Sequence, residues 1–199
     1  MKYIKMLGLA AMAAMALMAF VGAGTASATT LEDSKGVHPT TISASLLGSA
    51  TLESTTGSPP TVFETCTTGT VHGNPSTGSA TTTVTGVATI ASGGCTATTH
   101  VLGGGDLEIH HITGTSNGTV TGNTFEVTKS MFGASCVYGL SKTDAMVHLG
   151  TLIGSYTTPL MEVNTILPLR AGSFLCPSET RWTATYEVTT PSGLTVTAG

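Results

Sequence analysis

Residues 181–188 read Arg-Trp-Thr-Ala-Thr-Tyr-Glu-Val, and this stretch decides the class of fold. Trp182, Ala184, Tyr186 and Val188 alternate with polar residues at a strict period of two. Because successive side chains of a β-strand point to opposite faces, the stretch predicts a strand with one dry and one wet face. One-sided strands of this kind are typical of antiparallel sheets that pack against a core.

Similar alternation occurs at residues 42–46, 80–91, 124–128 and 145–153, with turn residues such as Pro59-Pro60 between the stretches. In 80–91 we expect one face to carry Val84, Ala88 and Ile90. In 145–153 we expect one side to carry Ala145, Val147, Leu149, Thr151 and Ile153, with His148 opposite. The Asn117-Gly118 pair predicts a two-residue hairpin turn. About eleven to thirteen short strands follow from this pattern.

The composition agrees with an all-β protein of 199 residues. Threonine, which favours strands, and glycine, which favours turns, make up close to a third of the chain. We therefore expect a single antiparallel β-sandwich domain at residues 41–199, immunoglobulin-like or jelly-roll-like, after a loose N-terminal arm at 29–40. Antibody-type domains place a Trp between their paired cysteines, whereas Trp182 follows the last cysteine here.

Residues 1–28 have the layout of a secretory signal peptide. Lys2 and Lys5 precede an apolar run at 6–21, and Ala26-Ser27-Ala28 forms an A-x-A cleavage site. The run is shorter than the roughly 20 residues that span a bilayer. We expect a secreted protein without stable membrane insertion after cleavage. Association with the cell surface is compatible with secretion.

Charge excludes a basic nucleic-acid binder. The formal net charge is −4, and cleavage leaves five basic and eleven acidic side chains, a net charge of −6. No Lys/Arg cluster that would contact a phosphate backbone exists after residue 5. Nucleic acid is therefore not an expected partner.

The four cysteines predict disulfide bonds, because an exported chain with an even number of cysteines meets an oxidising environment. Three pairings of Cys66, Cys95, Cys136 and Cys176 are possible. We favour Cys66–Cys95 and Cys136–Cys176, which close the most local loops. No two cysteines have the short spacing of a zinc site, so no metal or other cofactor is expected.

Candidate catalytic side chains are dispersed along the strands. Asp106, Glu108, His110 and His111 lie close together in sequence, and Glu126 could approach them across the Asn117-Gly118 hairpin. Neighbouring strand residues point to opposite faces, so His110 and His111 are not expected to share a ligand. A pocket that gathered two or more of these five residues would favour a secreted hydrolase.

Two further patterns suggest chemistry. Residues 114–118 match the G-x-S-x-G nucleophile motif around Ser116, but a β sequence follows where an α/β-hydrolase has a helix. Histidines from separate strands, such as His72, His100 and His111, would make a metal site only if they converged. We expect scattered surface histidines, including His38 and His148, and no catalytic serine.

Several motifs resemble those of uncharacterised bacterial secreted Thr/Gly-rich, four-cysteine β-sandwich proteins. They cover most of the mature chain: Phe63-Glu64-Thr65-Cys66, Gly69–Gly73, Ser92-Gly93-Gly94-Cys95, Cys136-Val137-Tyr138 and Trp182–Val188 before Pro191. The resemblance implies a disulfide-stabilised, exported β-sandwich and supplies no catalytic residues.

We therefore expect a non-enzymatic binding or surface-associated module. Its hydroxyl-rich, weakly charged exterior suits hydrogen bonding to a glycan or to a protein partner. The alternative is a secreted hydrolase whose site is assembled from Asp, Glu and His residues on separate strands.

Overall fold

The computed structural model of the protein describes residues 28–57, 59–76, 82–85, 91–95, 100–102, 106–131, 133–141 and 144–199. The predicted signal peptide lies outside these residues, apart from Ala28. So do Ala88 and Ile90 of the strand expected at 80–91.

The described chain is all β. Its strands are β1 (Thr29–Asp33), β2 (Ile42–Leu46), β3 (Ala50–Ser54), β4 (Val62–Cys66), β5 (Thr68–Pro75), β6 (Thr82–Thr85), β7 (Ala91–Gly93), β8 (His100–Leu102), β9 (Leu107–His111), β10 (Gly118–Gly122), β11 (Phe125–Met131), β12 (Ala134–Leu140), β13 (Val147–Ile153), β14 (Leu160–Ala171), β15 (Glu179–Thr190) and β16 (Leu194–Ala198). These sixteen strands of the described part exceed the eleven to thirteen expected.

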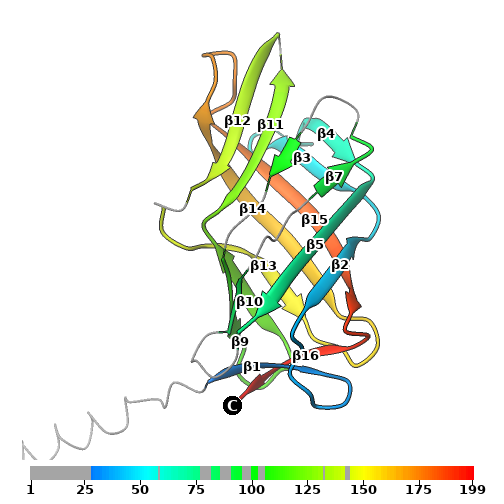
Figure 1. Ribbon diagram of the computed structural model, residues 1–199. Helices are drawn as coiled ribbons and strands as arrows, with labels where there is room; N and C mark the ends of the chain where they lie inside the picture. Colours follow the sequence, from blue (N-terminus) through cyan, green and yellow to red (C-terminus); the bar gives the residue numbers. More distant parts are fainter. Residues whose placement is uncertain are drawn as a thin grey trace, which may run out of the picture.

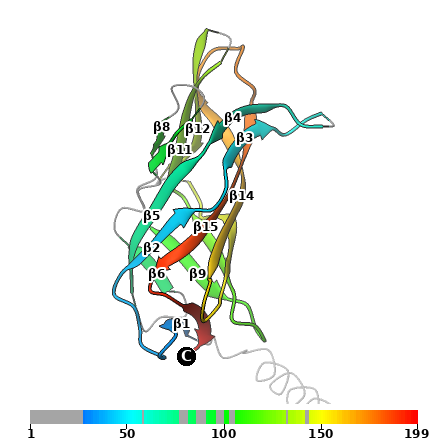
Figure 2. The same ribbon diagram turned by 90° about the vertical axis from the view of Figure 1, so that its right-hand side faces the viewer.

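Antiparallel pairing confirms the predicted β-sandwich. The strand order is β4-β3-β15-β2-β5-β6-β9-β10-β13-β14-β12-β11-β8, with β7 beside β5. The long strands β14 and β15 form the centre of one layer, and β5 and β11 lie in the other (Figures 1 and 2). Pairing of β15 with β2 and of β14 with β12 joins the layers.

The predicted N-terminal arm begins with an ordered strand. β1 pairs with β16 in full register, from Thr29 opposite Ala198 to Asp33 opposite Leu194. This two-stranded sheet crosses one end of the sandwich (Figure 1). Thr29 and Leu31 alternate with more exposed residues and both point into the core. Leu31, 2% exposed, covers that end of the sandwich.

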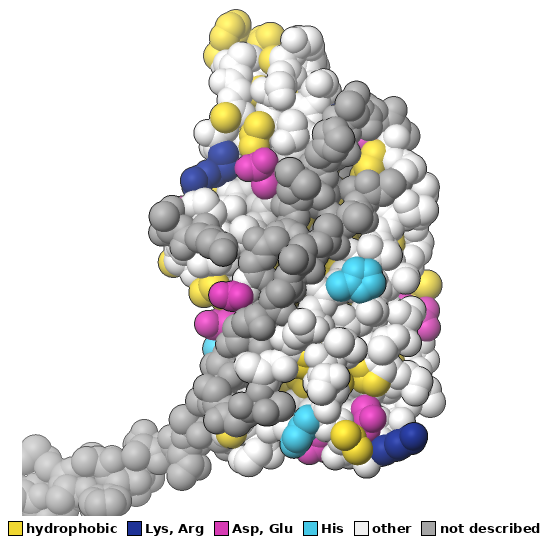
Figure 3. All heavy atoms as spheres, in the orientation of Figure 1, with side chains coloured by type: hydrophobic (Ala, Val, Ile, Leu, Met, Phe, Trp, Pro, Cys, Tyr) yellow, Lys and Arg dark blue, Asp and Glu magenta, His cyan; other side chains and the backbone are white. Residues whose placement is uncertain are grey.

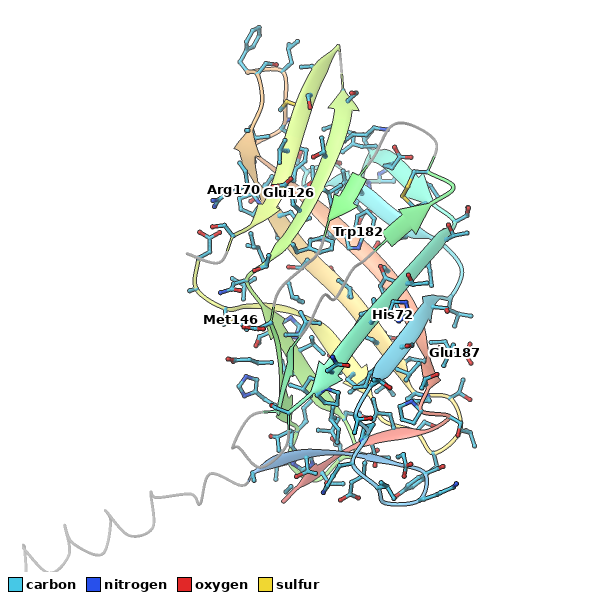
Figure 4. The ribbon with its side chains drawn as sticks, in the orientation of Figure 1. His72, Glu126, Met146, Arg170, Trp182 and Glu187 are labelled. Carbon is cyan, nitrogen blue, oxygen red and sulfur yellow. A yellow bond between two sulfur atoms is a disulfide. The ribbon has the colours of Figure 1, made fainter. Side chains whose placement is uncertain are left out.

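The apolar face predicted for residues 181–188 is confirmed in β15. Trp182, Ala184, Tyr186 and Val188 are all buried, with 0–5% of each residue exposed. The Trp182 ring contacts Phe125 of the other layer at a centroid distance of 5.9 Å. Figure 4 shows Trp182 in the interior between the layers.

The expected faces of residues 145–153 are wrong at both ends. Ala145 is exposed and precedes β13, and the alternation fails after Leu149. Leu149 and Leu152 are buried, whereas Thr151 and Ile153 are only half-buried; His148 is exposed as expected. The pairing of β10 with β13 shifts register between Val120 and Thr121, and this irregularity interrupts strict alternation.

The cysteines form the favoured pairs, Cys66–Cys95 and Cys136–Cys176. Among the residues that the structure describes, no helix has the length and apolar character needed to cross a membrane.

Candidate functional site

A polar groove lies on the outer face of β14 and β15. Ser49, Glu162, Asn164, Thr183 and Thr185 line it, together with Val163 and Ala184, whose side chains are buried. The groove has a volume of about 280 Å³ and opens to solvent. We call these seven residues the β14–β15 groove.

Strand periodicity builds the floor of this groove. Glu162 and Asn164 point outward because Val163 between them packs into the core. On β15, Thr185 lies opposite Glu162 and Thr183 lies opposite Asn164. Directly opposed residues share a face, so four polar side chains meet on one rigid two-stranded surface.

The turn between β2 and β3 forms one wall. Gly48 has a φ of 81°, a left-handed conformation that glycine adopts without steric cost. The Leu47 N–H donates to the Thr185 carbonyl at 2.8 Å, which holds the turn against β15 and places Ser49 beside the floor.

The groove supplies hydrogen-bonding groups of several kinds. Asn164 offers both donors and acceptors, the Glu162 carboxylate accepts, and the hydroxyls of Ser49 and Thr185 do both. The Thr183 hydroxyl already pairs with the Thr51 hydroxyl at 2.6 Å. This set can recognise a neutral, hydroxyl-rich ligand, and its single carboxylate is one fewer than the two that most glycoside hydrolases use.

A cavity inside the sandwich lacks such groups. Its volume is about 40 Å³, and every residue that lines it is apolar or glycine, including Ile42, Val71, Ile109, Leu152 and Val188. Small-molecule sites combine apolar walls with a few polar groups that orient the ligand. The interior cavity is therefore a gap in core packing and not a recognition site.

The structure does not bring the five predicted hydrolase residues together. Glu108 and His110 lie on one face of β9, with a carboxylate–imidazole distance of 3.5 Å, and both are half-buried. His111 points the other way and hydrogen-bonds to the Thr115 carbonyl at 2.7 Å. Asp106 is exposed before β9, and Glu126 lies on β11 opposite Gly139. None of the five lines the β14–β15 groove or the interior cavity.

Of the remaining candidates, His72 and Ser116 have separate hydrogen-bond partners. His72 hydrogen-bonds to the Ser43 hydroxyl at 2.9 Å on the neighbouring strand, and His100 lies on β8. The Ser116 hydroxyl hydrogen-bonds to the Gly154 carbonyl in a loop. Within the described part of the chain, no three His, Cys, Asp or Glu side chains are grouped as metal ligands.

The predicted Asn117-Gly118 turn is wrong in position. Gly118 belongs to β10 and lies opposite His111, so the loop between β9 and β10 spans residues 112–117. The turn uses Gly114, with a φ of 79°, and the Asn117 side chain accepts instead from the Gly154 N–H at 3.0 Å. This tertiary hydrogen bond overrides the local turn preference of Asn-Gly.

The aspartates with shifted pKa values stabilise loops. The Ser141 N–H donates to Asp144 at 2.7 Å and, with a smaller contribution from Arg170, lowers the pKa of that carboxyl. Asp33 accepts from the N–H groups of Val37 and Lys35, which lower its pKa in the same way. Neither carboxylate lines the β14–β15 groove.

Sequence reasoning missed a buried ion pair between Lys129 of β11 and Glu64 of β4. The two side chains are only 7% and 0% exposed. Every second residue of β11 points into the core. These residues are Phe125, Val127, Lys129 and Met131, and all four are buried. A lysine at an alternating position that is otherwise apolar was the sequence signal that could have revealed this buried ion pair.

Comparison of the chain with protein-family models, with curated proteins and with solved structures finds no match.

Proposed function

We propose that the protein is an exported, non-enzymatic binding module that recognises a glycan through the β14–β15 groove. The observation that carries this proposal is the meeting of Glu162, Asn164, Thr183 and Thr185 on one solvent-facing surface. Sugar hydroxyls both donate and accept hydrogen bonds, and the groove offers both kinds of partner.

The exterior supports recognition by hydrogen bonds more than by charge. Only 9% of the residues are charged. On the face shown in Figure 3, charged side chains are few and scattered between uncharged polar groups. A preformed groove on paired strands loses little conformational freedom when a ligand binds.

Export agrees with the signal-peptide layout of residues 1–28 and with the two disulfides, which persist in oxidising compartments. A disulfide-stabilised domain would keep the groove ordered outside the cell.

An array of immobilised glycans, probed with the labelled mature protein, tests the proposal. We expect binding to a subset of neutral glycans, and the Asn164→Ala/Thr185→Val double variant should weaken it by roughly tenfold or more, because each lost hydrogen bond costs about 1 kcal/mol. The Thr119→Val variant is the matched control, since Thr119 faces outward on β10 and does not line the groove.

Two outcomes would contradict the proposal. One is the absence of glycan binding, with retention of the protein only on a protein array. The other is binding that persists in the groove double variant but is lost on Phe174→Ser, because Phe174 is 95% exposed at the tip of a separate loop.

A further inference from the structure

The buried Lys129–Glu64 pair joins two strands that do not pair with each other. β4 pairs with β3, whereas β11 pairs with β12 and β8. The ammonium Nζ of Lys129 contacts Oε2 of Glu64 across the interior, 65 residues apart in sequence. The contact is therefore a specific link between segments that make no backbone pairing with each other.

Buried apolar side chains lie beside both members of the pair. Leu52 of β3 lies opposite Glu64, and Trp182 of β15 lies opposite Leu52; both are fully buried. Val127, also 0% exposed, shares the inner face of β11 with Lys129. Burial of two ions costs several kcal/mol each before their attraction is counted. A neutral link between the same two side chains would avoid that cost.

We propose that Lys129 and Glu64 condense to an intramolecular amide, a covalent cross-link between β11 and β4. The proton shared in the contact passes from Nζ to Oε2, which leaves an amine and a carboxylic acid. Nζ then attacks Cδ of Glu64 and forms the C–N bond. The Cδ–Oε2 bond breaks, and Oε2 departs as water with two of the three original ammonium protons, while the third stays on the amide nitrogen.

The chain's own groups favour this step. The Thr65 N–H donates to Oε1 of Glu64 at 3.1 Å, so it faces the oxygen on which negative charge develops when Nζ adds to Cδ. The strands hold the amine against the carboxyl, and effective molarities of such oriented pairs reach roughly 10⁵–10⁸ M. The condensation needs no oxidant, metal or second substrate, and water is its only by-product.

The cross-link would continue a covalent network at one end of the sandwich. Glu64 is two residues from Cys66 on β4, and Lys129 lies opposite Cys136 on β11 and β12. The amide would thus connect the neighbourhood of the Cys66–Cys95 disulfide with that of the Cys136–Cys176 disulfide.

The intact mass of the folded protein, measured after full reduction of the disulfides, tests the proposal. We expect a mass one water molecule below that of the linear chain. Tandem mass spectrometry of a digest should find a branched peptide that joins the segments of Glu64 and Lys129. The Glu53→Gln control, which changes a carboxylate of β3 outside the pair, should retain the water loss.

A wild-type mass equal to that of the reduced linear chain would overturn the proposal, whatever the variants do. The Lys129→Met variant should show the linear mass. A water loss that persisted in Lys129→Met, or a branched peptide located elsewhere, would also overturn it. The wild-type mass shows whether the water loss occurs, so the cross-link can still be tested if the Lys129→Met variant does not fold.

Discussion

Tyr138 shows how the interior combines polar groups with an apolar core. Its side chain is fully buried on β12, and its hydroxyl finds no hydrogen-bond partner among the described residues. Thr180 and Trp182 likewise leave a buried polar atom without a partner in that part of the chain. An unmade buried hydrogen bond costs about 1–3 kcal/mol, so this region is less stable than an apolar core of the same shape.

The Tyr138→Phe substitution should therefore stabilise the protein. It removes the unpaired hydroxyl and keeps the ring, so we expect the free energy of unfolding to rise by about 1 kcal/mol. Urea denaturation measures the change, and Tyr156→Phe is the control, because Tyr156 is 67% exposed and its hydroxyl contacts water. A loss of stability in Tyr138→Phe would show that the hydroxyl has a partner.

Alkaline pH should destabilise the folded protein through the same residue. Burial raises the pKa of Tyr138 from 10.0 to about 12. Between these values the unfolded chain releases the phenolic proton and the folded chain keeps it, so stability falls as the pH rises. Burial also raises the pKa of Tyr186, which adds to the loss of stability at alkaline pH.

Thermal melting at a series of pH values from neutral to about 12 measures this loss. In Tyr138→Phe the decline should be shallower than in the wild type. Equal declines in both proteins would assign the alkaline effect to other groups.

At the level of elements, the spacing of β13 and β14 depends on Gly150. It lies opposite Val163, and a Cβ atom at this position would stand 1.8 Å from the Glu162 carbonyl oxygen. No side chain fits there unless the two strands separate. Because Glu162 and Val163 also belong to the β14–β15 groove, this close approach supports the floor of the proposed site.

We expect Gly150→Ala to lower the free energy of unfolding by about 2–3 kcal/mol, as steric overlap in a packed region does. Thr151→Ala is the control on the same strand, because Thr151 is half-buried and its truncation creates no overlap. Urea denaturation of the two variants measures the difference. A stability change in Gly150→Ala no larger than that in Thr151→Ala would contradict the close packing of β13 and β14.

The elements that could be predicted from sequence are those with uninterrupted alternation. The period-two pattern of 181–188 placed Trp182 and Tyr186 in the core correctly. The pattern failed at 145–153, because Val120 and Thr121 of β10 pair with Gly150 and His148 and leave Leu149 of β13 as an extra residue. Such a bulge is a property of the pairing and not of the local sequence.

The candidate site was less accessible to sequence reasoning. The β14–β15 groove depends on the register that sets Glu162 opposite Thr185 and on the turn that delivers Ser49. Threonine residues are too frequent in this chain for Thr183 and Thr185 to stand out in sequence. The predicted hydrolase residues share a sequence neighbourhood, but β9 and β11 do not bring them to one pocket.

For the whole molecule, the two disulfides hold together a fold of mostly long-range contacts. Cys136–Cys176 ties β12 to the segment between β14 and β15, and it closes a 40-residue separation. Cross-links of this length restrict the unfolded chain and stabilise a fold by about 3–4 kcal/mol in the chain-entropy model.

Removal of this disulfide in Cys136→Ala/Cys176→Ala should lower the free energy of unfolding by about 3–4 kcal/mol. Urea denaturation measures the loss, and Ser178→Ala, in the same connecting segment, is the control. A reductant should then have a smaller effect on the variant than on the wild type. An unchanged stability would mean that the cross-link does not constrain the unfolded chain.

Nuclear magnetic resonance can show whether a glycan binds to the outer face of β14 and β15. The amide shifts of the ¹⁵N-labelled protein would be followed while the best-bound neutral oligosaccharide from the array is added. We predict that the saturable shifts concentrate at residues 162–164, 183–185 and Ser49. Shifts confined to other surfaces, or none at all, would contradict the account.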